Sequence, residues 1–299
     1  MGSVYAGLLA ANGHEVWAID TWREHVDAMQ QNGLRVEGAS GDRVARLSAT
    51  SDAADAGACD LIIIATKAMH VTAAARSAQN LLAPNSVVLS IQNGLGGPDM
   101  AAAVLGVDRV LVGVVGGFGA SMKAPGHVHH HGWELVRLGE LVGATTPRLQ
   151  QVAEVWSSAG FRVKCFDDIA QLIWEKLICN VTFSGICALT ERRIADVMQD
   201  KNAWRVASTC ASEAFAVARA LGVHLDFDDP VAYVKNFGEK IPGARPSALL
   251  DVLTGRMSEN DFINGAIGPA GEKVGVFAPY NEAVSDLVRA KERQLGLRK

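Results

Sequence analysis

The sequence lacks a long apolar run and a basic cluster, and each lack excludes a class of protein. Its longest apolar stretches, such as Asp60–Ala65, are far shorter than the roughly 18 residues that a membrane span needs. The net charge of −4 and the scattered lysines and arginines offer no footprint for a phosphate backbone. We therefore expect neither a membrane nor nucleic acid as a partner.

Paired cysteines and a leader pattern are also lacking. The five cysteines are odd in number and scattered, and the N-terminus shows no basic region followed by an apolar core. These features predict reduced thiols and a cytoplasmic protein. Cys179 and Cys187 are expected to act as buried apolar residues rather than as redox groups.

The length of 299 residues leaves room for two domains of about 100 to 200 residues each. The first two-thirds of the chain alternates β-rich runs with helical patterns, which is typical of a doubly wound parallel sheet. Strands are predicted at residues 15–19, 60–65, 86–91 and 109–115, and helices at 3–11, 22–31, 71–82 and 98–105. The second and third strands are apolar on both faces, as strands covered by helices on both sides should be.

After Gly126 the pattern changes. Two alternating runs, Val128–His131 and Glu134–Leu138, predict an antiparallel hairpin or meander that closes the domain. A helix at 146–158 and a short strand at 161–164 follow. From Asp167 onward strand signals vanish. The sequence thus predicts an α/β Rossmann-type domain at residues 1–166 for dinucleotide binding, followed by an all-helical substrate and catalytic domain at 167–299.

The N-terminal segment resembles the later part of a βαβ dinucleotide-binding unit. A helix ending at Gly13 precedes a strand, and Gly2 fits the third glycine of a G-x-G-x-x-G fingerprint, which permits close helix packing. The first strand and the earlier glycines are expected upstream of Met1. The alternative is that Met1 is the true start and that the first helix simply packs on the sheet. A chain without that strand or a replacement is expected to bind dinucleotide weakly.

Asp20 follows the strand at 15–19 and lies 18 residues after Gly2. An acidic side chain at this place binds the adenosine ribose hydroxyls and repels a 2′-phosphate, so Asp20 favours NADH. Two alternatives stay open. Arg23 is close enough in sequence to reach a phosphate, and an aspartate after a strand is also a common turn residue.

Further residues suit the reduction of a carbonyl group. Lys67 and Asn93 follow predicted strands, and ligands bind at the carboxyl ends of strands in open α/β sheets. Lys176 and Asn180 are spaced i, i+4 and leave one face of a helix. A cation that can also give a proton stabilises the charge that a hydride leaves on a ketone oxygen. Standing alone, Lys176 would be interpreted as a solvated helix lysine.

The last segment of interest runs from Ser247 to Gly265. Ser258 with Asp261 predicts a helix N-cap, which leaves Glu259 in the first turn of that helix. Standing alone, Glu259 would be interpreted as a charge favoured there by the helix dipole.

In this order and spacing the motifs resemble ketopantoate reductase (2-dehydropantoate 2-reductase). They are a lysine after a strand, a strand-end Asn-Gly, Trp-x-Lys-x-x-x-Asn, and a serine followed twelve residues later by Glu-x-Asp-x-Ile-Asn-Gly. The resemblance covers nearly the whole chain. It implies hydride transfer from NAD(P)H to ketopantoate, with NADPH as the family's cofactor, and it allows for a homodimer.

By this resemblance, Lys176 is the general acid. Glu259 also belongs to the catalytic residues, and it binds the cofactor ribose. The remaining residues divide between the two ligands: Lys67, Asn93 and Ala120 contact the cofactor, and Asn93, Asn180, Ser184 and Ser247 hold the substrate. We expect the ammonium of Lys176 to face the same space as Asn93, Ser247 and Glu259.

The departures from the family pattern fall on the substrate side. Where the family commonly carries asparagines, this sequence has Ser184, a residue near Ile194 and one near Ala244, and the last two side chains cannot form hydrogen bonds. Another 2-keto acid therefore stays open as substrate. The rival functions are a 3-hydroxyacid dehydrogenase, which the segment from Ser247 to Gly265 disfavours, and a non-catalytic dinucleotide sensor, which Lys176 and Glu259 together disfavour.

The run His127–His131 places alternate histidines on one face of a strand. We expect no metal there, because no carboxylate or cysteine stands at a ligand-like spacing nearby.

Overall fold

The computed structural model describes residues 1–133 and 135–298. The contacts within the chain divide it into two compact units, Met1–Gln92 with Gly97–Ile169, and Asn93–Gly96 with Ala170–Lys299. Each unit is described by itself. The assignment of cofactor binding to the first part and of substrate binding and catalysis to the second stays a prediction.

The main sheet of the first unit has five strands in the order β11-β10-β7-β6-β5. Their bounds are Cys59–Ile64 (β5), Leu82–Ser90 (β6), Val110–Val115 (β7), Val136–Glu140 (β10) and Val163–Cys165 (β11). Strands β5, β6 and β7 are parallel, whereas β10 runs antiparallel to β7 and parallel to β11.

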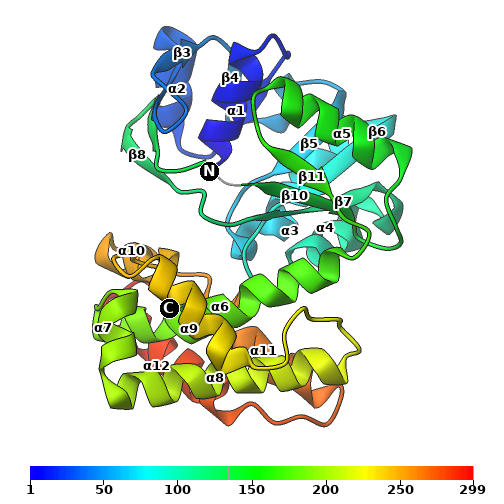
Figure 1. The fold of residues 1–299 in the computed structure, drawn as a ribbon. Coiled ribbons are helices and arrows are strands. Elements are labelled where there is room, and N and C mark those ends of the chain that lie inside the picture. Colours follow the sequence, from blue (N-terminus) through cyan, green and yellow to red (C-terminus); the bar gives the residue numbers. More distant parts are fainter. Residues whose placement is uncertain (134, 299) are drawn as a thin grey trace. The chain divides into compact units, whose positions relative to one another are not determined.

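Successive side chains of the central strands enter different cores, because strand residues alternate between the two faces of a sheet. Ile62 and Val88 pack in one core with α3 (Val71–Ala78) and α4 (Gly97–Leu105). Ile63 and Leu89 pack in the other with α1 (Gly2–Ala11) and α5 (Pro147–Ser158). Helices thus cover both faces of the sheet (Figure 1), which confirms the predicted doubly wound arrangement.

Two smaller sheets complete this unit. One pairs β1 (Trp17–Ile19) with β4 (Ser48–Thr50) in parallel. The other has the order β3-β2-β9-β8 and consists of Arg43–Ala45 (β3), Leu34–Gly38 (β2), His127–His130 (β9) and Ala120–Ala124 (β8). Helix α2 (Arg23–Asn32) connects β1 to β2.

The predicted hairpin or meander after Gly126 is wrong. Strand β9 pairs with β8 and β2, whereas β10 pairs with β7 and β11 in the five-stranded sheet. Alternation shows that each run has one buried face, but it does not say which strand lies beside it. Glu134, the predicted first residue of the second run, lies outside the described residues.

The second unit is built from helices, and residues 168–298 contain no strand, as predicted. The helices are Ile169–Thr190 (α6), Ile194–Gln199 (α7), Lys201–Ala220 (α8), Pro230–Lys240 (α9), Ser247–Leu253 (α10), Asn264–Glu272 (α11) and Pro279–Gln294 (α12). Short 3₁₀ turns lie at Ala53–Asp55, Ala68–His70, Gln79–Leu81, Val107–Arg109 and Asn260–Phe262.

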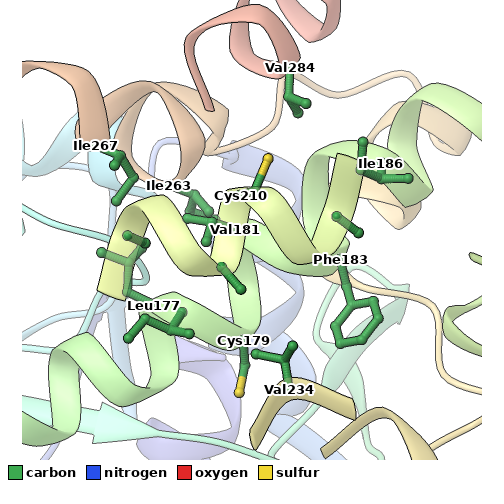
Figure 2. Close-up of a cluster of buried hydrophobic side chains, with 14 of the residues drawn as sticks. Leu177, Cys179, Val181, Phe183, Ile186, Cys210, Val234, Ile263, Ile267 and Val284 are labelled. Atoms are coloured by element: carbon green, nitrogen blue, oxygen red, sulfur yellow. The ribbon is translucent and has the colours of Figure 1, made fainter. Parts of the chain in front are cut away.

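Helix α6 forms the centre of the helical core. Its side chains Leu177, Val181 and Phe183 are almost fully buried and lie among residues of α8, α9, α11 and α12 (Figure 2). The expectation that every apolar run is too short to cross a membrane is wrong for α6, which is long and apolar enough. Because 67% of its apolar window is buried inside the protein, its composition serves the core.

Candidate active site

Lys176, Asn180 and Ser184 lie on α6 at successive steps of four residues, so they share one side of the helix. Leu177 and Val181 lie on the other side and are fully buried. Lys176 and Asn180 are half-buried, and Ser184 is 5% exposed. The packing of the apolar side therefore fixes the direction in which the ammonium and the amide leave the helix.

The core beside this row of polar residues is shielded from solvent, with Cys179 4% and Cys187 0% exposed. Burial raises the pKa of the Cys179 thiol to about 12, with the nearby Glu175 carboxylate adding to the rise. Burial likewise raises the pKa of Cys187 to about 12. Thiols with such pKa values stay protonated at neutral pH, so they are poor nucleophiles, which favours the apolar role expected from the sequence.

Glu175 fixes α6 from the residue next to Lys176. Its Oε1 accepts hydrogen bonds from Gln171 Nε2 at 3.0 Å and from the backbone N–H of Asp226 at 3.1 Å. The second bond ties α6 to the segment between α8 and α9. Sequence reasoning passed over Glu175, although its place beside the lysine was a usable signal.

Glu259 is buried, with 8% exposure, and meets Asn93 from a distant part of the chain. Asn93 Nδ2 donates to Glu259 Oε2 at 3.3 Å, and Leu95 N donates to the Phe262 carbonyl at 2.8 Å. Gly94 between them has a φ of 82°, and a Cβ there would collide with the Phe262 carbonyl. These contacts place the turn at 93–96 in the helical unit.

The turn at 93–96 follows β6, and Gln92 fixes the end of that strand. Its Nε2 donates to the carbonyls of Ile64 at 2.6 Å and Thr66 at 3.2 Å, at the end of the neighbouring strand β5. Gln92 therefore ties together the carboxyl ends of two parallel strands. Its position directly before Asn93 was the available sequence signal.

Hydrogen bonds and ion pairs hold the segment that carries Glu259. Ser258 donates from both its backbone N–H and its Oγ to Glu292 Oε1, at 2.9 and 2.6 Å. Asp261 accepts from Arg289 Nε and Arg298 Nη2, each at 2.7 Å. The Arg298 guanidinium also donates to the fully buried Glu292, at 2.9 Å. The two arginines hold the pKa of Asp261 below its usual range against the opposing effect of burial.

The predicted N-cap at Ser258 is therefore wrong. Helix α11 begins at Asn264, and Glu259 precedes a 3₁₀ turn instead of lying in the first turn of an α-helix. Ser258 Oγ does accept a bond from Asn260 N at 3.3 Å, but the Asp261 carboxylate turns toward the two arginines. Pairing with charged groups far along the chain outcompetes the local capping box.

Ser247 is the exposed first residue of α10, after Pro246. Asp251 on the same helix is 5% exposed and lies 3.3 Å from Arg256 Nε. This ion pair links α10 to the turn that leads toward Ser258.

The remaining predicted residues lie in the first unit. Gly2 is the first residue of α1, and an added Cβ would lie 3.4 Å from Ala65 Cβ just after β5. Asp20 comes directly after β1, and its Oδ1 accepts from Trp22 N at 2.9 Å, as a turn aspartate does. Lys67, half-buried, precedes the 3₁₀ turn at 68–70, and Ala120 begins β8 opposite His130.

The histidine run has a carboxylate beside it that comes from a distant part of the chain, so its spacing in the sequence could not reveal it. Glu37 lies 3.0 Å from His127 Nε2 and 3.2 Å from His129 Nδ1, because β2 pairs in parallel with β9. The two histidines hold the pKa of Glu37 below its usual range. Across residues 1–133 and 135–298, no group of three or more His, Cys, Asp or Glu side chains is arranged to hold a metal ion.

The structure therefore gathers the predicted residues into two sets. The second unit holds Asn93 against Glu259, with Lys176, Asn180 and Ser184 on α6 and Ser247 on α10. The first unit holds Gly2, Asp20, Lys67 and Ala120.

Comparison with known proteins gives the same family for both parts of the chain. Residues 1–143 match the family described as ketopantoate reductase PanE/ApbA, and residues 168–292 match ketopantoate reductase PanE/ApbA C terminal. The 2-dehydropantoate 2-reductase of Lactococcus lactis subsp. lactis is 30% identical over 300 residues, covering 99% of this chain and 96% of the relative. That of Archaeoglobus fulgidus is 30% identical over 295 residues, with the same coverage.

Two solved structures are similar over almost their whole length. The PanE/ApbA family ketopantoate reductase from Ralstonia eutropha JMP134 has a TM-score of 0.89 and 32% identity, covering 98% of this chain and 95% of its own. The D-mandelate dehydrogenase in complex with NADH and anilino(oxo)acetate has a TM-score of 0.91 and 29% identity, covering 100% and 97%.

Proposed function

The chain belongs to the ketopantoate reductase PanE/ApbA family, and on this premise we propose that it reduces the ketone of a 2-keto acid to a 2-hydroxy acid. A nicotinamide cofactor supplies the hydride when bound. The observation that carries the proposal is the contact of Asn93 with the buried Glu259, in the same unit as the Lys176 helix. Ketopantoate is the first substrate to consider, since the curated relatives are named 2-dehydropantoate 2-reductases.

Lys176 is the proton donor in this proposal. When hydride reaches the carbonyl carbon, the electron pair of the C=O π bond moves to the oxygen, which takes a proton from the Lys176 ammonium. The neutral amine then regains a proton from solvent. General acid catalysis of this kind contributes about 10²–10⁴-fold to the rate. The packed opposite side of α6 keeps the ammonium oriented for this transfer.

The polar residues along α6 and α10 orient the substrate. Asn180 is one helical turn from Lys176, so its amide can donate to the substrate while the ammonium approaches the ketone oxygen. Ser184, one turn further, and Ser247 on α10 add hydroxyl donors for a carboxylate or hydroxyl group.

Residues of the first unit fit a dinucleotide. The amides at the start of α1 are the donors that a helix N-terminus offers to a pyrophosphate, and Gly2 leaves the close approach to Ala65 open. Asp20 would bind the adenosine ribose, and Lys67 and Ala120 would contact the cofactor. By the family resemblance, Glu259 would bind the cofactor ribose, and Asn93, its partner at 3.3 Å, would contact the cofactor.

We expect NADH to be used at least as well as NADPH, because the Asp20 carboxylate would repel a 2′-phosphate. The D-mandelate dehydrogenase structures, which carry NADH, are compatible with this. Asp20→Asn keeps the oxygen that accepts from Trp22 N and removes the charge. It should raise the NADPH to NADH ratio of kcat/KM about tenfold, the effect of roughly 1.4 kcal/mol of lost repulsion. Asp27→Asn, on the exposed side of α2, controls for the change in net charge. An unchanged ratio in Asp20→Asn would contradict the role of Asp20 in cofactor choice. A hundredfold preference of the unsubstituted protein for NADPH would contradict it as well.

An aryl 2-keto acid is the second candidate substrate, and one observation favours it. Ile194 and Ala244 lie side by side, with Ile194 N donating to the Ala244 carbonyl at 3.2 Å, and Ile194 is 2% exposed. Neither side chain can bind the hydroxyl group of ketopantoate. The similar D-mandelate dehydrogenase was crystallised with an aryl-bearing keto acid analogue, anilino(oxo)acetate.

The test is oxidation of NADH and NADPH against ketopantoate, phenylglyoxylate and pyruvate, with Lys176→Ala as the blank for each substrate. Reduction of any one of them that disappears in Lys176→Ala supports the reaction, and the ranking of kcat/KM identifies the substrate class. Dinucleotide binding measured by NADH fluorescence, without turnover of any 2-keto acid, would favour the sensor alternative instead.

A further inference from the structure

The buried imidazole of His25 links three elements of the sheet unit. His25 lies on α2 and is 2% exposed, and its ring stacks on that of Trp22, with 5.3 Å between the centroids and 19° between the planes. Its Nε2 lies 3.2 Å from the Oγ of Ser3 on α1. The backbone N–H of Gly126, in the turn between β8 and β9, donates to its Nδ1 at 2.8 Å. Both ring nitrogens are therefore engaged.

These two contacts fix the position of the imidazole proton. A backbone N–H can only donate, so the Nδ1 of His25 must be the unprotonated nitrogen. Burial lowers the pKa of His25, against the opposing effect of the Asp20 carboxylate, so the ring is neutral at pH 7 and carries its one proton on Nε2. His25 therefore donates from Nε2 to the Oγ of Ser3.

The hydroxyl hydrogen of Ser3 is directed to another acceptor. Because the Ser3 Oγ accepts from His25, its own hydrogen turns away from that ring. The acceptor that the structure gives it is the thioether sulfur of Met122 on β8, at 4.0 Å, and a thioether is a weak acceptor. An anionic oxygen would form a much stronger bond with the same hydroxyl.

Ser3 lies at the end of α1 where the pyrophosphate is proposed to bind. It is the second residue of the helix and is half-buried. The amides of Val4 and Tyr5 donate to the Met1 carbonyl. The amides of Gly2 and Ser3 precede the first bond within the helix, and such amides point along the helix axis toward an incoming anion. A pyrophosphate oxygen at these amides would come within reach of the Ser3 hydroxyl.

We propose that His25 is a positioning residue for the cofactor: by donating to the Ser3 Oγ, it directs the Ser3 hydroxyl hydrogen to a pyrophosphate oxygen of the dinucleotide. This role rests on the proposed function, because it takes the dinucleotide to bind at the start of α1. Ser3 contacts the ligand, and His25 acts through Ser3. Trp22 covers one face of the imidazole, which keeps water from replacing the bond to Ser3.

Calorimetric titration with NADH and with ADP-ribose, which carries the pyrophosphate but no nicotinamide, tests the role of Ser3. Ser3→Ala should raise the Kd of both ligands about tenfold, as loss of a hydrogen bond to a charged group does. In turnover the KM for NADH should rise while kcat changes little, since the bond is present in the ground state and the transition state alike. His14→Asn is the matched control. It breaks another His–Ser contact, at 2.8 Å from Ser158 just beyond the other end of α1, and should leave both Kd values unchanged.

Two replacements of His25 separate positioning from a purely structural role. The amide of His25→Gln lies near the place of Nε2 and can still donate to Ser3. The amide of His25→Asn reaches only the place of Nδ1, where it can accept from Gly126. We expect His25→Asn to raise the Kd of both ligands about fivefold, the effect of one neutral hydrogen bond, and His25→Gln to raise it less. A role limited to holding the turn at Gly126 predicts the reverse order.

A double variant tests whether His25 acts through Ser3. His25→Asn should add little to the effect of Ser3→Ala, because the hydroxyl that it orients is then absent. The proposal is overturned by NADH binding that Ser3→Ala leaves unchanged, by additive effects of the two substitutions, or by a His25→Gln variant that binds more weakly than His25→Asn. Thermal unfolding checks that each variant is folded, and Ser3→Ala alone still decides if a His25 variant is not. An unsubstituted protein that binds neither NADH nor ADP-ribose would overturn the proposed function as well.

Discussion

The two units hold their candidate residues in different ways. In the helical unit, Glu259 stands on a segment fixed by Glu292, Arg298 and Asp261, ionic groups that are buried or partly buried. In the sheet unit, Asp20 stands exposed after a short strand, and its one described side-chain bond closes a local turn. Reacting groups must be held to fractions of an ångström, which needs such support, whereas ribose recognition tolerates a looser residue.

Removal of Lys176 should have the largest effect of all the substitutions. A variant without Lys176 that kept full activity would contradict the contrast drawn between the two units. Lys176→Ala removes both the proton donor and the charge that stabilises the alkoxide. It should therefore lower kcat about 10²-fold or more and leave dinucleotide affinity little changed. Lys176→Arg should rescue poorly, since guanidinium keeps its proton at any working pH. Steady-state kinetics on the best substrate, with NADH titration by fluorescence, measure both quantities; full turnover in Lys176→Ala would refute the mechanism.

The network behind Glu259 should give the next largest effect, on stability. Arg298→Met leaves the fully buried Glu292 and the half-buried Asp261 short of a cation. Because Arg298 retains 19% side-chain exposure, we expect a loss of about 2 kcal/mol in the free energy of unfolding rather than the 3–5 of a fully buried pair. Urea unfolding measures it.

Arg192→Met is the matched control, because its pair with Asp200 is exposed and should contribute less than about 1 kcal/mol. Equal losses in the two variants would mean that the buried network stabilises the segment no more than a surface pair does.

The sequence predicted those features that depend on local periodicity. Apolar runs on both faces of β5 and β6 indicated strands between two helical layers, and the four-residue step from Lys176 to Asn180 placed both on one side of α6. The motif order identified the family before any geometry was known.

Long-range partners could not be predicted in this way. The Asn93 contact with Glu259 spans 166 positions, and the Arg298 contact with Asp261 spans 37. Glu37 beside His129 depends on the parallel pairing of β2 with β9, and a strand's periodicity does not specify its neighbour. The same limit explains the wrong hairpin or meander, because β9 and β10, which are consecutive in the sequence, belong to different sheets.

A smaller effect on the free energy of unfolding is expected from substitutions in the turn at 93–96. Two glycines of this turn allow the cost of a steric contact to be separated from the cost of backbone strain. Gly94 and Gly96 both have positive φ, 82° and 87°, but only at Gly94 would a Cβ meet the Phe262 carbonyl. Gly96→Ala should lose about 1 kcal/mol in the free energy of unfolding, the strain alone. Gly94→Ala should lose about 1 kcal/mol more and raise KM for the cofactor, since Asn93 is displaced from Glu259. Urea unfolding and kinetics of the pair test this; indistinguishable variants would mean that the Phe262 contact does not position Asn93.

The smallest expected effect lies in the sheet unit, at His130. Its ring is fully buried, with centroids 4.4 Å from Phe118 and 5.1 Å from Trp133. Burial lowers the pKa of His130 below 6.5, and the neighbouring His131 and His129 lower it further. The unfolded chain, with the higher pKa, binds more protons as the pH falls through 6.5. The stabilisation is therefore complete above that pH and declines below it.

The smallest predicted effect is on the acid sensitivity of folding. Between pH 7 and 5 the free energy of unfolding of His130→Phe should fall less steeply than that of the unsubstituted protein, by at most about 1.4 kcal/mol per pH unit. The exposed His224→Gln is the control and should leave the slope unchanged. His25 and His131, whose pKa values burial also lowers, should keep part of the acid sensitivity. Urea unfolding at several pH values checks the slopes, and an unchanged slope in His130→Phe would show that His130 does not titrate in this range.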